Sequence, residues 1–191
     1  IQPDVNDSQF PSVQFPQIYS VSTTGGRPKL YSSLAMENLS ISPDGKQLLY
    51  NDMKGYEDTW RKHHTSSITR DIWLCTTDGN RSYRKLTDFN GEDRNPVWKA
   101  DGSAYYYLSE RDGNFNVYKS TIDGKNTVKI TSHPKHPVRF LTTSNDGKLC
   151  YGYDGEIYTV TEGSQPSKVS VAITSDRDRK STRLNSSHSR I

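Results

Sequence analysis

The clearest pattern of apolar and polar positions lies in residues 95–118, NPVWKADGSAYYYLSERDGNFNVY. An apolar run ending in Trp98 leads into an Asp-Gly pair, three tyrosines follow, and a second Asp-Gly pair precedes another apolar run. Asp-Gly between apolar runs is a strong hairpin signal, because glycine takes the positive φ that a tight turn requires. The stretch therefore predicts a β-meander, and we expect its aromatic side chains to lie in the core.

Two motifs recur along the chain at a fixed spacing. One places Asp-Gly before a strand-like run, in ISPDGKQLLY, WKADGSAYYY and TSNDGKLCYG, and the other follows such a run, in DIWLCTTDGN and NVYKSTIDGK. Asp101 and Asp146 are 45 residues apart, and so are Asp78 and Asp123. A repeat of this length with four short strands is typical of a β-propeller blade.

One repeat is longer than the others. Asp44 and Asp101 are 57 residues apart, which exceeds the period by 12. The additional residues lie between Asn51 and Arg70, in a polar segment. We interpret this segment as a long loop between the second and third strands of its blade.

These spacings predict an all-β fold, a partial β-propeller of about three and a half four-stranded antiparallel blades, as a fragment of a six- or seven-bladed propeller. We expect a connecting segment over 1–16 and a propeller domain over 17–178. The tail over 179–191 lacks aromatic residues and Asp-Gly pairs, and is interpreted as non-native or disordered. The predicted blades are 17–31 (partial), 37–87, 95–131 and 137–171.

Composition supports a folded core despite low overall hydrophobicity. Hydrophobic residues make up 31% of the chain and the mean hydropathy is −0.88, but 12 Tyr, 5 Phe and 3 Trp supply apolar area suited to pleated surfaces. Cys75 and Cys150 lie in apolar runs of different repeats, so two buried thiols are expected rather than a disulfide.

The charge distribution argues against two classes of partner. The net charge of +3 becomes −1 when the four basic residues of the tail over 179–191 are set aside. A nucleic-acid or anionic-membrane binder would carry a concentrated basic patch. No segment has the apolar length of a membrane helix, so neither nucleic-acid binding nor membrane insertion is expected.

The long loop carries the sharpest candidates for a contact site. His63 and His64 are adjacent, which does not match zinc-ligand spacings of two to five residues, so a solvated loop is favoured over a metal site. Aromatic and arginine side chains dominate interface hot spots, and the loop also holds Tyr56, Trp60 and Arg61. Contact with a peptide or partner protein is therefore the better functional hypothesis for these five residues.

A second candidate lies between two predicted blades. His133 and His136 flank Pro134 in SHPKHPVRF, a rigid connector. Connectors of this kind lie at the rim of a propeller channel, where the two imidazoles could meet a passing chain. A simple turn is the favoured interpretation and peptide contact is the alternative.

No catalytic, cofactor-binding or metal-binding residue is predicted. There is no Gly-x-Ser-x-Gly elbow, no ordered Ser, His and acid set, no phosphate-binding glycine loop and no Cys-His zinc framework. Aspartates that precede glycine, namely Asp101, Asp112, Asp123 and Asp146, are expected to cap turns by accepting hydrogen bonds from the backbone two residues on. In GEDRNPVW, Glu92, Asp93 and Arg94 favour a local salt-bridged cluster over a carboxylate active site.

The repeats ISPDGK, NPVWKADGS and SERDGNFNVY resemble the WD-like, PD-type repeats of the TolB and tricorn propellers, over residues 17–172. The combination of KHHTSSITRDIWL with DFNGEDRNPVWKADGSAYYYLSERDGNFNVYK resembles the N-terminal propeller of bacterial tricorn-like serine peptidases. In that family the catalytic serine and histidine lie in later domains, so no catalytic residue carries over to this chain.

The resemblance implies a non-catalytic module that guides, gates or docks peptides for a serine peptidase, with the downstream domains of the same chain as partners. It implies export to the periplasm, no cofactor, and leaves a homo-oligomer open. The alternative is a free-standing TolB-like propeller scaffold that binds protein partners. A catalytic segment or a stop codon further along the gene would distinguish the two.

Overall fold

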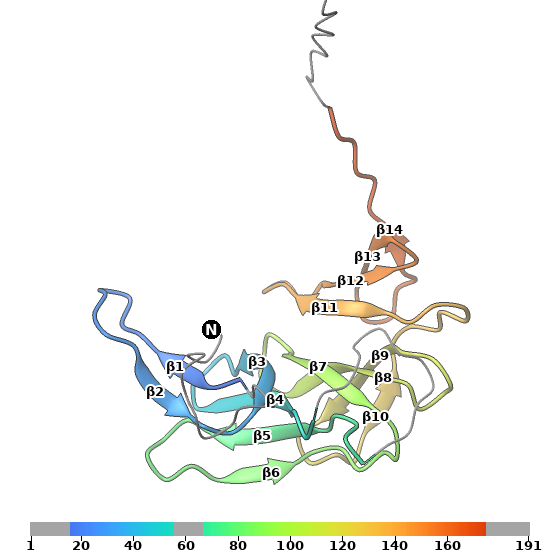
Figure 1. Ribbon diagram of the computed structural model, residues 1–191. Helices are drawn as coiled ribbons and strands as arrows, with labels where there is room; N and C mark the ends of the chain where they lie inside the picture. The colour runs from blue at the N-terminus through green and yellow to red at the C-terminus, as the bar shows by residue number, and fades with distance from the viewer. Residues whose placement is uncertain (1–15, 56–66, 175–191) are drawn as a thin grey trace, which may run out of the picture.

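The computed structural model describes residues 16–55 and 67–174, and every regular element in them is a β-strand (Figure 1). The first sheet pairs β1 (Ile18–Ser20) with β2 (Lys29–Ser32). Three four-stranded sheets follow, and we call each of the four sheets a blade. Their strands are β3 (Met36–Ile41), β4 (Gln47–Asp52), β5 (Ile72–Thr76) and β6 (Tyr83–Lys85); β7 (Asp93–Trp98), β8 (Ala104–Ser109), β9 (Asn116–Thr121) and β10 (Thr127–Lys129); and β11 (Arg139–Thr143), β12 (Leu149–Tyr153), β13 (Glu156–Val160) and β14 (Ser167–Lys168).

Each four-stranded blade is an antiparallel meander whose strands lie in chain order. The predicted fold class, about three and a half four-stranded blades of a partial β-propeller, is confirmed. The first strands β3, β7 and β11 lie next to one another, and the last strands β6 and β10 lie away from them (Figure 1). Because propeller blades surround a central channel, β3, β7 and β11 face the centre.

Most of the predicted Asp-Gly turns form as expected. Gly102 has a φ of +72°, and the carboxylates of Asp101, Asp123 and Asp146 each accept a hydrogen bond from the backbone N–H two residues on, at 2.9, 3.2 and 3.4 Å. Asp112 differs from the prediction. Its carboxylate accepts hydrogen bonds from a tyrosine of β9 and a lysine of β10, and so ties its turn to the outer strands of the blade.

The core consists of apolar layers between successive blades. Trp98 and Tyr105 of the third blade pack with Leu49 and Leu74 of the second. The predicted core position of Trp98 is confirmed, because it is 4% exposed and its indole Nε1 donates to the carbonyl oxygen of Ser40 at 2.9 Å. Similar clusters join the first blade to the second and the third to the fourth.

A bulge recurs in the first strand of each four-stranded blade. Between the first and second strands, the register shifts so that two residues of the first strand oppose one of the second. The additional residue is Asn38 in β3, Asn95 in β7 and Phe140 in β11, with φ values of +51°, +56° and +57°. A bulge with one left-handed residue bends its strand and re-aims the side chains beside it.

The long connection between β4 and β5 starts and ends at a closed base. The N–H of Asp52 donates to the carbonyl oxygen of Asp71 at 3.1 Å, and the N–H of Asp71 donates to the Asp52 side chain at 2.8 Å. The Lys54 ammonium lies against the Asp71 carboxylate and donates to the carbonyl oxygen of Thr69. The segment does join the second and third strands of its blade, and its residues 56–66 lie outside the described part of the chain.

Two further expectations concern cysteines and membranes. Cys75 is a buried free thiol in β5, and Cys150 is a half-buried free thiol in β12. Over residues 16–55 and 67–174, no helix has the length and apolar character needed to cross a membrane.

Candidate functional site

The three bulges bring equivalent residues of successive blades to one cavity at the centre. The register places Glu37, Arg94 and Arg139 at one repeat position and the three left-handed residues at the next. The cavity has a volume of about 160 Å³. It is lined by Glu37, Asn38, Arg70, Arg94, Asn95, Leu108, Arg139 and Phe140. We call this set the central site.

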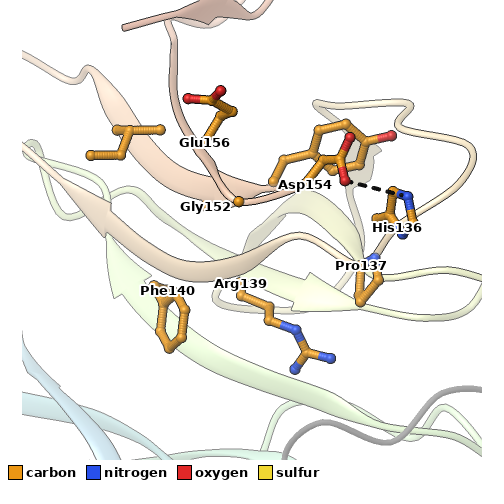
Figure 2. Close-up of a pocket in the computed structure, with 10 residues that line it drawn as sticks. His136, Pro137, Arg139, Phe140, Gly152, Asp154 and Glu156 are labelled. Carbon is orange, nitrogen blue, oxygen red and sulfur yellow. Dashed lines mark ion pairs between the residues drawn. The ribbon is translucent and has the colours of Figure 1, made fainter. Parts of the chain in front are cut away.

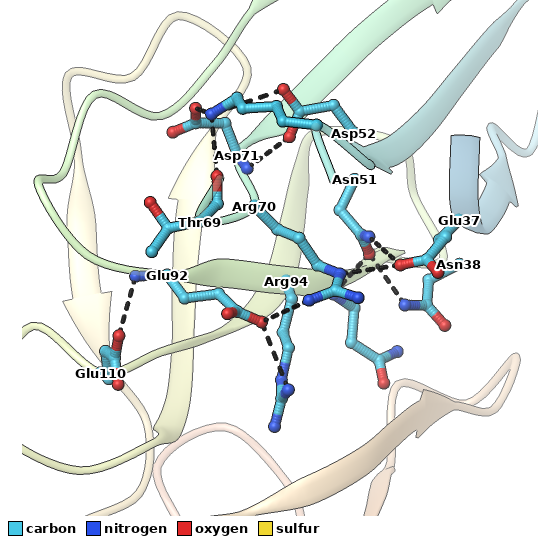
Figure 3. Close-up of polar contacts among 12 residues, drawn as sticks. Glu37, Asn38, Asn51, Asp52, Thr69, Arg70, Asp71, Glu92, Arg94 and Glu110 are labelled. Atoms are coloured by element: carbon cyan, nitrogen blue, oxygen red, sulfur yellow. Dashed lines mark hydrogen bonds and ion pairs between the residues drawn. The ribbon is translucent and has the colours of Figure 1, made fainter. Parts of the chain in front are cut away.

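Arg70 joins two blades within the central site. It precedes β5, and its Nε donates to Oε2 of Glu37 at 2.7 Å. Its guanidinium also lies 3.5 Å from Oε1 of Glu92. Figure 3 shows the Arg70 guanidinium between the two carboxylates. The Arg70 and Glu92 side chains are 4% and 0% exposed, so this ion pair is held in a desolvated setting where a charge needs its partner.

Arg94 shares the Glu92 carboxylate with Arg70. Its guanidinium donates to Oε1 of Glu92 at 3.3 Å and lies 4.2 Å from the ring centre of Phe115. Burial lowers the pKa of the Arg94 guanidinium. Glu92 opposes this shift, and repulsion from Arg139 and Arg70 adds to it. The sequence prediction of a local salt-bridged cluster at Glu92 and Arg94 is confirmed, and the pairing with Arg70 extends it to the second blade.

Two asparagines connect the blades through the central site. Oδ1 of the buried Asn51 accepts hydrogen bonds from the Asn38 side chain at 2.8 Å and from the backbone N–H of Asn95 at 3.2 Å. The Asn95 side chain donates to the carbonyl oxygen of Leu141 in the fourth blade at 3.0 Å. These bonds fix the relative positions of β3, β7 and β11, so the cavity is a built feature rather than a gap between blades.

The fourth blade carries a second, larger hollow of about 480 Å³. Arg139 and Phe140 line both this hollow and the central site. Figure 2 shows Arg139 and Phe140 on the same side of the β11 ribbon, which the bulge between them explains. His136 also lines the larger hollow, where its Nε2 lies 3.4 Å from Oδ1 of Asp154.

His133 lies in an aromatic cluster of the fourth blade. Its ring stacks on Tyr153 with centres 3.9 Å apart, and its Nε2 lies 2.8 Å from the hydroxyl of Tyr151. Burial lowers the pKa of the His133 imidazole, so the ring is neutral near pH 7. Of the two predicted histidines, His136 borders a hollow and His133 packs between strands. Their contact with a peptide stays a prediction.

The other predicted contact residues, Tyr56, Trp60, Arg61, His63 and His64, lie outside the described part of the chain. The described ends of their loop meet at Asp71, one residue from Arg70 of the central site. Sequence reasoning did not predict the central site. The signal was present in the repeat alignment, which places two arginines and a glutamate at one position.

The central site offers guanidinium groups and hydrogen-bond donors, together with the Glu37 carboxylate at its wall. Three guanidinium groups and the Glu37 carboxylate line the cavity, and the buried Glu92 carboxylate pairs with Arg70 and Arg94. Such a set can hold a carboxylate or a peptide backbone. Among the described residues, no group of three His, Cys, Asp or Glu side chains could hold a metal ion.

Comparison with known proteins relates the chain to large peptidases and to TolB. It is 23% identical over 180 residues to a tricorn protease homolog of Saccharolobus solfataricus, a match that covers 92% of this chain and 16% of that protein. The solved structure of a putative TolB from Agrobacterium tumefaciens has a TM-score of 0.64 and 22% identity, over 80% of this chain and 55% of that one. A tricorn protease structure has a TM-score of 0.58 and 16% identity, over 83% and 20% of the two chains.

These structural likenesses show the fold, and the chain spans about a sixth of the length of the curated relative. The family assignment rests on the sequence. The model of a family described as the tricorn protease N-terminal beta propeller domain matches residues 5–166. The chain therefore belongs to the tricorn protease N-terminal β-propeller family.

Proposed function

We propose that this chain is the non-catalytic propeller module of a tricorn-like serine peptidase, and that it guides peptides through its centre toward catalytic domains of the same protein. The observation that carries the proposal is the central site. Equivalent residues of three blades converge on one polar, cationic cavity at the place where a propeller has its channel. Membership of the tricorn N-terminal propeller family supports the link to a peptidase.

The site favours extended peptides over other substrates. Guanidinium groups and side-chain amides pair with carboxylates and peptide carbonyls, and the net charge of −1 over residues 1–178 argues against nucleic acid. The downstream domains and a peptide are the partners in this proposal, and a homo-oligomer is compatible with it. Export to the periplasm belongs to the same proposal, and fractionation of cells that express the full-length protein tests it.

The test separates guiding from catalysis. The purified propeller is expected to bind labelled peptides in a fluorescence anisotropy assay without hydrolysing them, while the full-length protein hydrolyses the same peptides. Hydrolysis by the propeller alone would contradict the proposal, as would a full-length protein without peptidase activity.

The second candidate is a free-standing TolB-like scaffold that binds protein partners. The observation that favours it is the higher TM-score with the putative TolB than with the tricorn protease. Sequencing the gene beyond residue 178 distinguishes the two candidates. A segment with a catalytic serine supports the peptidase module, and a stop codon after three more blades supports the scaffold.

A further inference from the structure

The connector between β10 and β11 is fixed to the third blade through its backbone. The N–H of His133 donates to the side-chain oxygen of Asn116 at 2.8 Å, and the Asn116 side chain donates to the carbonyl oxygen of His133 at 3.1 Å. The Asn114 side chain donates to the carbonyl oxygen of His136 at 2.6 Å. Because both asparagines are neutral, these contacts hold the connector without placing a charge beside it.

The ring of His133 is held by the fourth blade. It stacks on Tyr153 with ring centres 3.9 Å apart, and the ring centres of Tyr151 and Tyr158 lie 5.6 and 5.5 Å away at steep angles. Tyr151 belongs to the apolar cluster between the two blades, and the other two tyrosines pack against that cluster. We call the space between the three rings the tyrosine slot. His133 therefore joins the two blades, with its backbone on one and its ring on the other.

The hydrogen bond in the tyrosine slot requires a neutral histidine. Tyr151 is 1% exposed, and within residues 16–55 and 67–174 the one hydrogen-bond partner of its hydroxyl is Nε2 of His133, at 2.8 Å. A buried hydroxyl needs an acceptor for its proton, so the fully bonded arrangement has the Tyr151 hydroxyl donating to an unprotonated Nε2. Protonation of His133 turns Nε2 into a donor and leaves the hydroxyl proton of Tyr151 without an acceptor.

The surroundings of His133 do not supply a negative charge that would offset this loss. The titratable side chains that face the ring or share its tyrosines are Tyr151, Tyr153, Tyr158 and His136. The Asp154 carboxylate lies against His136 instead. Stacking on a tyrosine attracts an imidazolium, but burial of the ring opposes the charge and lowers the pKa of His133.

We propose that His133 is a pH-sensitive link between the third and fourth blades. Above the ordinary histidine pKa of 6.5, the neutral ring stays in the tyrosine slot and holds the connector. The unfolded chain binds a proton near this pH and the ring in the slot resists it, so the link is lost as the pH falls below this value. His136, Pro137 and Tyr153 line the larger hollow, so the hollow changes shape when the link opens. This inference goes beyond the proposed function, because it concerns the joint between two blades and does not depend on a peptide.

Hydrogen–deuterium exchange of the full-length protein, followed by mass spectrometry, tests the link. The amides of residues 131–138 are compared near pH 5 and near pH 7.5, after correction for the intrinsic pH dependence of exchange. The buried strand β8 is the internal reference. In the wild type the connector is expected to lose protection near pH 5, while β8 keeps its protection.

Three substitutions identify the groups. His133→Gln keeps an acceptor for Tyr151 without a titratable ring, and is expected to give the same connector protection at both pH values. Tyr151→Phe removes the hydroxyl that loses its acceptor, so its loss of protection near pH 5 should be smaller than that of the wild type. His136→Gln is the matched control, because the His136 side chain is 45% exposed in the same connector, and it should keep the wild-type loss.

The wild type alone can overturn the proposal, since equal connector protection at both pH values would show that no link opens. A loss near pH 5 that persists in His133→Gln, or that disappears in His136→Gln, would assign the effect to another group. A full loss in Tyr151→Phe would show that the hydrogen bond is not its cause. Protection of β8 near pH 7.5 shows that each variant is folded.

Discussion

Individual side chains of this protein affect its stability either through core packing or through their charge. Trp98 shows the first. It fills the layer between the second and third blades and bonds to Ser40 of the neighbouring blade, so it joins two sheets that the local sequence does not connect.

Trp98→Ala is expected to lower the free energy of unfolding by about 3 to 5 kcal/mol, because a large buried side chain is lost and a cavity remains. Urea unfolding measures the change. Trp98→Phe is the control, since it keeps a ring in the layer and loses the bond to Ser40, and it should cost less. Intact stability in the alanine variant would show that the blades do not depend on this side chain.

Asp93 affects stability through its charge. It is 1% exposed, its Oδ2 lies 3.3 Å from the Arg111 guanidinium, and burial raises its pKa from 3.8 to about 6. In the unfolded chain the group ionises near pH 4, but in the folded protein it holds its proton up to about pH 6. Its contribution to stability is therefore present at low pH and is lost as the pH rises through this window.

Asp93→Asn should remove this loss. The variant is expected to gain stability relative to the wild type between pH 4 and pH 7, by roughly 2 to 3 kcal/mol in total, because each pKa unit corresponds to 1.36 kcal/mol. Chemical unfolding at several pH values measures the difference. A difference that does not change with pH would contradict the raised pKa.

The elements differ in how far the sequence predicts them. Asp-Gly pairs and apolar runs predict the meanders, because a turn and its flanking strands depend on residues that are neighbours in the chain. The sequence did not predict the bulges, because their left-handed residues are Asn38, Asn95 and Phe140 rather than glycines. The ion pairs of Arg70 with Glu37 and Glu92 were not predicted either, because these three residues come from separate parts of the sequence.

The connection between β4 and β5 is the element most open to change. Its base is closed by the bonds between Asp52 and Asp71, and a side-chain atom on Gly55 would meet Ile68, so the two ends of the loop already lie together. The sequence hypothesis of a contact loop at Tyr56, Trp60, Arg61, His63 and His64 remains to be tested.

Deleting residues 56–67 is expected to leave the melting temperature nearly unchanged, because loop length has a weak entropic cost and the base keeps its bonds. Peptide binding is expected to change. Replacement of the same residues by a Gly-Ser segment of equal length is the control for the loss of side chains alone. A large drop in melting temperature would show that the loop packs on the blades.

At the scale of the whole molecule, the described blades form an arc with an open face at each end. Val21 and Leu30 of the first blade are more than half exposed, and Ile157 of the fourth blade is 46% exposed. Exposed strand edges and apolar faces of this kind are covered in closed propellers.

The propeller is therefore expected to melt at a higher temperature in the full-length protein than in the 191-residue chain alone. Differential scanning calorimetry of both proteins measures this. Equal melting temperatures would mean that further blades contribute nothing to the stability of this arc.

The recurrent bulge determines how many neighbouring residues each blade presents to the centre. In an ordinary strand only every second side chain faces one side, but the one-residue offset lets each blade present two neighbouring residues to the centre, here Glu-Asn, Arg-Asn and Arg-Phe. The backbone that presents these pairs is the same in all three blades. Swapping pairs between blades would therefore change the charge and the shape of the cavity, and it would also remove hydrogen bonds of Asn38 and Asn95 that hold the strands in place.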